Sequence, residues 1–122
     1  MEKKKKTEQK SVKEVKAKNI GIVGVVAPEN KCDDINCPFH GKLTVRGKIL
    51  EVKVVSNKMD KSAVVVWDRL VKVPKYERYM KKRSKLSVHV PPCIDVEVGD
   101  RVKIMECRPI SKTKKFVIIQ KM

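Results

Sequence analysis

The chain has 122 residues, and 30 lysine and arginine side chains against 14 aspartate and glutamate side chains give it a formal net charge of +16 at pH 7. This length fits one domain, and a hydrophobic content of 41% is enough for a core, so disorder of the whole chain is excluded. The longest apolar run, residues 20–27, is far shorter than the ~20 residues of a membrane span, and no secretory signal follows the lysine-rich start, so we expect no membrane partner.

The first 18 residues differ in composition from the rest of the chain. They contain eight lysines and three glutamates, and only two valines are spaced for one helical face. Two apolar side chains cannot hold an isolated helix of this length. We therefore predict a disordered or extended basic arm over residues 1–18 and a folded domain over residues 19–122. The net charge far exceeds what solubility needs, and it indicates a polyanionic partner along which such an arm can order.

Two long strands are predicted in the first half of the domain. In the first, the apolar residues stand at odd positions up to Ile49 and at even positions from Leu50, just after Gly47. Because side chains alternate between the two faces of a strand, such a slip indicates a bulge or a sharp bend. The second strand begins at Ala63 and ends before Pro74, which has no N–H to donate to a sheet.

The stretch from residue 75 to residue 85 is strongly basic, and its only acidic residue is Glu77. No apolar stripe forms in it, so we predict a loop or a brief helix that projects from the sheet. Tyr76 and Tyr79 lie among the charges. A tyrosine there can stack on a splayed base, but we expect at least one of them to pack over the end of the barrel predicted below. The basic side chains are candidates for phosphate contacts: Lys75, Arg78, Lys81, Lys82, Arg83 and Lys85.

Three shorter strands complete the pattern. Apolar and polar residues alternate over residues 86–90 and, after a turn at residues 98–100, over residues 101–104, and the last strand covers residues 116–119. Five strands with little helix suit a barrel without exposed edges. We therefore predict an all-β fold, a five-stranded barrel like the oligonucleotide/oligosaccharide-binding (OB) fold. Residues 91–98 are too short and too rich in proline for the helix that this fold often carries there.

A basic loop separates the last two strands. Residues 108–115 combine an arginine, which can grip a phosphate with two N–H groups, with lysines that act as mobile point charges. Ser111 and Thr113 add hydroxyl donors. These residues predict a phosphate-binding loop, although charge alone supports a solvated hairpin loop equally well.

One arrangement indicates metal chemistry. Cys32 and Cys37 are followed by His40, so a turn can supply three of the four ligands that structural zinc takes. The two close cysteine pairs of a zinc ribbon are missing, and buried thiols beside a hydrogen-bonded imidazole are the other interpretation. The candidates for a fourth ligand are Asp33, Asp34, Cys93 and Cys107. We therefore predict no cofactor and keep a structural zinc as the alternative.

Catalytic groups are scarce in this sequence. The chain has two histidines, one of which, His89, lies within a predicted strand. Gly21 and Gly24 lack the strand–turn–helix context and the Gly-Lys-Ser/Thr of a phosphate-binding loop. We therefore predict that the chain is not an enzyme and has no small-molecule substrate.

Two segments resemble a known family. Residues 54–62 resemble the first hairpin of the small ribosomal subunit protein seventeen family (universal ribosomal protein uS-seventeen), and residues 98–116 resemble its second characteristic segment. The resemblance extends over about residues 43–120. Residues 30–41 and 74–79 are similar to the archaeal branch of that family.

This resemblance implies an OB-fold domain that binds small-subunit ribosomal RNA early in assembly and stays as a structural constituent. Its expected partners are this RNA and neighbouring small-subunit proteins, and its expected location is the cytoplasm, bound to ribosomes. We expect binding by charge neutralisation and shape matching. The positions that match the family's two loops are Lys58, Met59, Lys61, Arg108, Ser111, Lys112, Thr113 and Lys114, and the charge of the second loop adds Lys115.

Two alternatives remain. One is a freestanding single-strand RNA binder or RNA chaperone on the same fold. The small number of aromatic residues, five in the whole chain, disfavours it, because unpaired bases usually stack on aromatic side chains. The other is a structural zinc protein that contacts protein partners.

Overall fold

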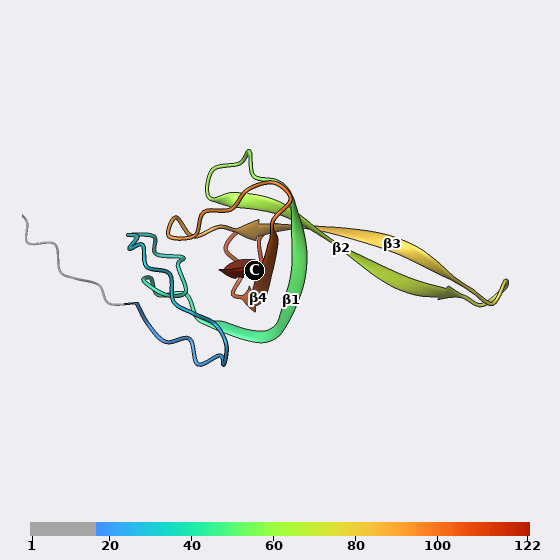
Figure 1. The fold of residues 1–122 in the computed structure, drawn as a ribbon, viewed down its shortest axis with the longest axis horizontal. Coiled ribbons are helices and arrows are strands. Elements are labelled where there is room, and N and C mark those ends of the chain that lie inside the picture. The colour runs from blue at the N-terminus through green and yellow to red at the C-terminus, as the bar shows by residue number, and fades with distance from the viewer. Residues whose placement is uncertain (1–16) are drawn as a thin grey trace, which may run out of the picture.

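The computed structural model describes residues 17–122, and all regular structure in this range is β-strand. The five strands are β1 (Val45–Ser56), β2 (Ser62–Val73), β3 (Arg78–His89), β4 (Arg101–Cys107) and β5 (Phe116–Lys121) (Figure 1). The predicted arm at residues 1–18 lies outside the described residues, except for its last two. In the described part of the chain, no helix is long and apolar enough to cross a membrane.

The strands close into a barrel in the order β1–β2–β3–β5–β4, with β4 returning to pair with β1. The pairings are antiparallel except for a short parallel contact between β3 and β5, where His89 lies opposite Val117. Closure gives the strands partners on both sides and removes the open edges of a flat sheet. The prediction of an all-β, five-stranded barrel is confirmed.

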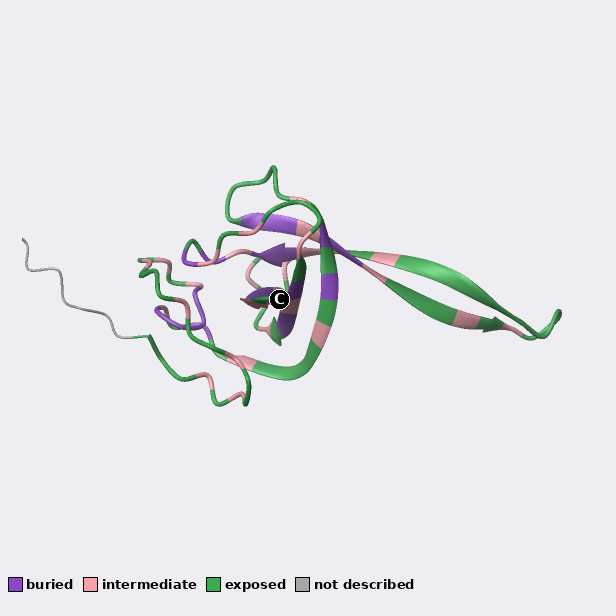
Figure 2. Cartoon of the chain, in the orientation of Figure 1, coloured by how far each residue is buried: buried purple, intermediate pink, exposed green. Residues whose placement is uncertain are grey.

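Aliphatic side chains fill the barrel, because alternate residues of each strand point inward. β1 contributes Val52 and Val54, and β4 contributes Val102 and Ile104, all of them buried. The other members of this core are Ala63, Val65, Val88 and Ile118. Figure 2 shows that the buried residues gather in the barrel and in the segments beside it.

The first strand bends where the sequence slips. The register between β1 and β4 shifts between Val45 and Ile49. Gly47 lies in this interval with a φ of +109°, and a Cβ there would come within 2.6 Å of Glu106 Oε2. Glycine adopts this positive φ easily, whereas any other residue would be strained there. The predicted irregularity is confirmed, a few residues before the expected point.

The β2–β3 hairpin extends far beyond the barrel. The two strands pair without interruption along their whole length, and their outer halves project into solvent with the turn at residues 74–77 (Figure 1). We call residues 67–84 the ribbon. The predicted loop or brief helix at residues 75–85 is wrong, because the chain is strand from Arg78 onward. β2 supplies the backbone partners of this segment, and charged residues on both faces leave no apolar alternation by which a strand is recognised.

Candidate nucleic-acid interface

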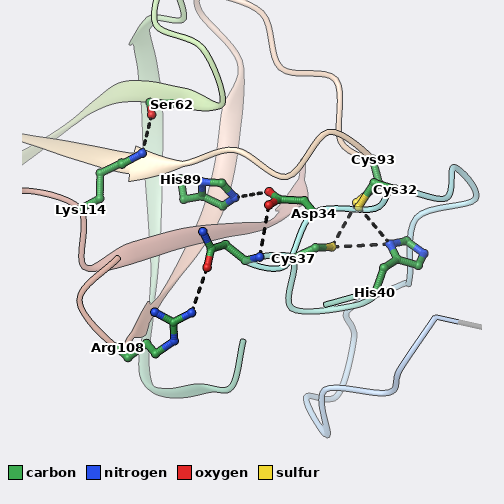
Figure 3. Close-up of polar contacts among 10 residues, drawn as sticks. Cys32, Asp34, Cys37, His40, Ser62, His89, Cys93, Arg108 and Lys114 are labelled. Carbon is green, nitrogen blue, oxygen red and sulfur yellow. Dashed lines mark hydrogen bonds and ion pairs between the residues drawn. The ribbon is translucent and has the colours of Figure 1, made fainter. Parts of the chain in front are cut away.

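The β4–β5 loop (residues 108–115) reaches the start of β2, directly after the β1–β2 loop (residues 57–61). Lys114 Nζ donates a hydrogen bond of 2.9 Å to the Oγ of Ser62, the buried first residue of β2 (Figure 3). The fold therefore links the second loop predicted to contact RNA to the residue that follows the first one. The predicted residues of the first loop are all exposed: Lys58, Met59 and Lys61.

Internal hydrogen bonds hold the β4–β5 loop in shape. The backbone N–H of Lys114 donates to Ser111 Oγ at 3.1 Å, and that of Ile110 donates to the Lys114 carbonyl at 3.0 Å. Arg108 Nη2 donates to Asn36 Oδ1 at 3.0 Å, which ties the start of the loop to the segment before β1. Two of the predicted RNA contacts, Arg108 and Lys114, therefore also hold the loop in place. The other predicted residues of the loop are exposed: Ser111, Lys112, Thr113 and Lys115.

The ribbon and the residues beside it carry the other predicted phosphate contacts. All of these are exposed: Lys75, Arg78, Lys81, Lys82, Arg83 and Lys85. Arg83 Nε pairs with Asp68 Oδ1 across the two strands at 3.1 Å. Arg69 and Lys72 of β2 are exposed beside the predicted residues, and they were not predicted. Treating the segment as a hairpin identifies them, because cross-strand partners lie on the same face.

Two tyrosines mark the tip of the ribbon. Tyr76 and Tyr79 are 66% and 70% exposed, so the prediction that one of them packs over the end of the barrel is wrong. Lys75 Nζ lies 5.5 Å from the centroid of the Tyr76 ring, within the range of a cation–π interaction. The far end of the ribbon, which carries both residues, lies well away from the barrel (Figure 1).

Four metal-ligating side chains converge beside the barrel (Figure 3). We call them the thiol–imidazole cluster: Cys32, Cys37, His40 and Cys93. Their ligand atoms all lie within 4.8 Å of one another. The three predicted residues are brought together, and of the four candidates for a fourth member Cys93 joins them, whereas Cys107 and the two aspartates do not. The cluster is a group that can hold a metal ion.

Burial sets the protonation of two thiols in this cluster. It raises the pKa of Cys37, while hydrogen bonds from the backbone N–H groups of His40 and Phe39 act in the opposite direction. Burial also raises the pKa of Cys93. The protein alone therefore favours the neutral thiols, and a bound cation favours the thiolates.

The chain between the first two cysteines makes further contacts with the barrel (Figure 3). Asp34 Oδ2 lies 2.6 Å from His89 Nε2 at the end of β3, and both side chains are almost completely buried. The backbone N–H of Asn36 donates to the other Asp34 oxygen at 3.2 Å. His89 Nδ1 is buried and has no hydrogen-bond partner within the described residues. The short segment therefore bonds to β3 through Asp34 and to the β4–β5 loop through Asn36.

Comparison with known proteins decides the family. The family model described as Ribosomal protein S17 matches residues 52–120, more than half of the chain. The chain belongs to this family. Small ribosomal subunit protein uS17 of Sulfurisphaera tokodaii is 55% identical over 104 residues, which are 85% of this chain and 92% of the relative. Small ribosomal subunit protein uS17 of Methanopyrus kandleri is 55% identical over 104 residues, which are 85% of this chain and 87% of the relative. That of Methanocaldococcus jannaschii is 53% identical over 106 residues, which are 87% of this chain and 90% of the relative.

Membership of the ribosomal protein S17 family settles the broad role of the chain. It is a structural constituent of the small ribosomal subunit and not an enzyme, as the resemblance implied. These relatives are archaeal, which confirms the resemblance to the archaeal branch. The match to the family model begins at residue 52, so Cys32, Cys37 and His40 lie before it.

Proposed function

We propose that this chain binds small-subunit ribosomal RNA early in assembly, through its two basic loops and its ribbon, and remains bound in cytoplasmic ribosomes beside neighbouring small-subunit proteins. The observation that carries the proposal is the arrangement of charge on the ribbon. Arg69 of β2 stands directly opposite Lys82 of β3, and both are exposed.

Such an arrangement is unfavourable in the protein alone. Like charges directly opposite each other destabilise a strand pair, and a two-stranded ribbon without a core is only marginally stable in water. Asp68, paired with Arg83, and Glu77 at the turn are the acidic residues of the ribbon. A polyanion laid along the ribbon would remove the repulsion, and folded RNA offers phosphates at fixed spacing over such a length.

The two basic loops would contribute in a different way. Arg108 uses one N–H on Asn36 and keeps further N–H groups for a phosphate. Lys114 is bonded to Ser62, so the loop keeps its shape before RNA arrives. A preformed loop loses little conformational entropy on binding and selects RNA by shape. Charge neutralisation by the ribbon and shape matching by the loops together would fix converging RNA helices relative to each other.

The same geometry disfavours a general single-strand binder. Such proteins stack successive bases on aromatic side chains along a groove. Trp67 of β2 is only partly exposed, and the two exposed tyrosines lie at the ribbon tip, away from the barrel. Tyr76 and Tyr79 are therefore better placed to stack on one or two bases that a folded RNA presents.

The test is a salt titration of binding to folded small-subunit RNA. Replacing Arg108, Lys112 and Lys114 with alanine should weaken binding and reduce the slope of log K against log salt by ~0.7–0.9 for each phosphate group that the variant no longer binds. A ribbon variant with Arg69, Lys81 and Lys82 replaced by alanine should do the same. The matched control replaces three exposed lysines outside the proposed interface: Lys31, Lys42 and Lys48.

The control should retain a larger slope than either interface variant. Thermal unfolding of each variant identifies any loss of fold, which matters most for Lys114 because of its bond to Ser62. If the slope falls equally in all three variants, the charge acts without regard to position and the proposed interface is wrong.

A further inference from the structure

Three of the distances within the thiol–imidazole cluster are close to the edges of a coordination tetrahedron, and all of its ligand atoms lie within 4.8 Å of one another. Cys32 Sγ and Cys37 Sγ lie 3.4 and 3.5 Å from His40 Nδ1, and Cys37 Sγ lies 3.6 Å from Cys93 Sγ. Tetrahedral zinc, with Zn–S of about 2.3 Å and Zn–N of about 2.0–2.1 Å, places sulfur about 3.8 Å from sulfur and about 3.6 Å from nitrogen. We propose that this cluster is a structural zinc site with three thiolates and His40 Nδ1 as its ligands.

The ligand chemistry favours zinc over other common ions. Three sulfur atoms and one imidazole nitrogen suit zinc, whereas magnesium and calcium take oxygen ligands. Four protein ligands leave no coordination position for water or substrate, which is the arrangement of structural sites. Three of the four residues are buried and Cys32 is partly buried, so a bound ion would be shielded from solvent.

The turn that follows Cys37 is shaped to present a sulfur and a nitrogen to one point. The backbone N–H groups of Phe39 and His40 are directed at Cys37 Sγ, as is needed to stabilise a thiolate. The N–H of Gly41 donates to the Cys37 carbonyl at 2.9 Å and closes the turn. A Cβ on Gly41 would clash with the backbone carbonyl oxygen of Ile35, so only glycine fits there.

The fourth ligand comes from a distant part of the chain. Cys93 lies in the connection between β3 and β4, 56 residues after Cys37. The N–H of Ile94 donates to the Pro91 carbonyl at 3.1 Å, and this turn holds Cys93 against the cluster. Zinc would therefore fasten the segment before β1 to the barrel, where Phe39 and the cysteines form a small buried core of their own.

The site also reaches the proposed RNA interface. Between Cys32 and Cys37, Asp34 pairs with His89 and Asn36 accepts a hydrogen bond from Arg108. Fixing the two cysteines fixes this short segment, and with it the side chain of Arg108. This part of the inference rests on the proposed function, whereas zinc binding itself does not.

The experiment measures zinc in the full-length chain, produced in zinc-containing medium and freed of loosely bound metal. Wild type should hold one zinc per chain, and Cys93→Ser should lose at least tenfold in zinc affinity. Cys107→Ser is the matched control, because Cys107 is a partly buried cysteine outside the cluster, and it should keep one zinc. His40→Cys should also retain zinc, since four thiolates form a complete site.

A spectroscopic measurement on wild type keeps the proposal testable if Cys93→Ser does not fold. X-ray absorption at the zinc edge should show three sulfur atoms at about 2.3 Å and one nitrogen at about 2.0–2.1 Å. Less than one zinc per ten chains, an oxygen-rich shell, iron in place of zinc, or a Cys37–Cys93 disulfide in the purified chain would each overturn the proposal.

The link to Arg108 is tested separately. Stripping zinc should weaken binding of wild type to folded small-subunit RNA, and it should have a smaller effect on an Arg108→Ala variant, which has no guanidinium to position. Zinc content is measured without RNA, so a chain that holds zinc but binds no RNA contradicts the proposed function alone. A chain that binds RNA equally well with and without zinc contradicts the link alone.

Discussion

The two halves of the β2–β3 hairpin share one continuous set of strand pairs and differ in what surrounds their side chains. Along one face of β2 the sequence runs Ala63, Val65, Trp67 and Arg69; the first two are fully buried and Arg69 is exposed. The face that fills the barrel therefore becomes, four residues later, the face that carries charge. Strand pairing depends on the backbone, so one hairpin can serve as core at one end and as a cationic surface at the other.

The difference has an energetic side. The inner half is stabilised by apolar burial. The outer half buries few side chains, and it places Arg69 directly opposite Lys82. We therefore expect its strands to stay ordered because they continue from the barrel. We infer that stability is concentrated in the inner half and RNA affinity in the outer half, and the following predictions test that division.

The largest expected effect comes from the same substitution made in each half. Val88→Ala removes two methyl groups from a fully buried site and should lower the free energy of unfolding by about 2 kcal/mol. Val71→Ala, at a partly buried position in the outer half of β2, should cost less than about 1 kcal/mol. Urea denaturation measures both. Equal losses would mean that the ribbon contributes to the core as much as the barrel does.

A change of charge on the ribbon should separate stability from binding. Arg69→Glu places a carboxylate opposite Lys82 and should stabilise the chain by roughly 0.2–1 kcal/mol, while it weakens binding to folded small-subunit RNA. Arg69→Gln is the control that removes the repulsion without adding an attraction, and it should give a smaller gain in stability. A loss of stability in Arg69→Glu would show that the paired positive charges do not strain the ribbon.

The smallest effect concerns a charge pair on the barrel. Lys121 Nζ lies 2.7 Å from Asp100 Oδ2 and lowers the pKa of this carboxyl, and the backbone N–H of Glu97 acts in the same direction. Because the folded-state pKa is lower than the unfolded one, the resulting stabilisation is present above the unfolded pKa of Asp100 and is lost as the pH falls through the folded one.

Asp100→Asn should therefore be less stable than wild type at pH 6, and the difference should shrink below about pH 4. The difference in stability between wild type and Lys121→Gln should also shrink as the pH falls. Thermal unfolding from pH 3 to pH 7 measures both, and a difference that is independent of pH would contradict the assignment to this pair.

Much of the barrel follows from the sequence, because its determinants are local. The slip of apolar positions after Gly47 marked the bend, and alternation marked the buried parts of the strands. The outer half of β3 was missed for the opposite reason. Its charged residues do not alternate regularly with apolar ones. Its strand conformation depends on pairing with β2, which no local sequence pattern shows.

The candidate sites divide in the same way. The loop residues 108–115 were visible as a run of charge and hydroxyl groups, and most of them are exposed. Their contact with RNA stays a prediction. Arg69 and Lys72 were missed because they join the basic residues only through strand pairing. Cys93 could be named only as one of several candidates, since its place beside Cys37 is set by the closure of the barrel and not by spacing along the chain.

In the proposed function, the loops and the ribbon hold positive charge in an arrangement that is complementary to folded small-subunit RNA. The most direct test of this proposal is a competition, at one salt concentration, between folded small-subunit RNA and an unstructured homopolymer of equal length for the full-length chain. The account predicts that the folded RNA displaces the homopolymer at a much lower concentration than the reverse. Equal affinity for the two would contradict it and would favour a general single-strand binder.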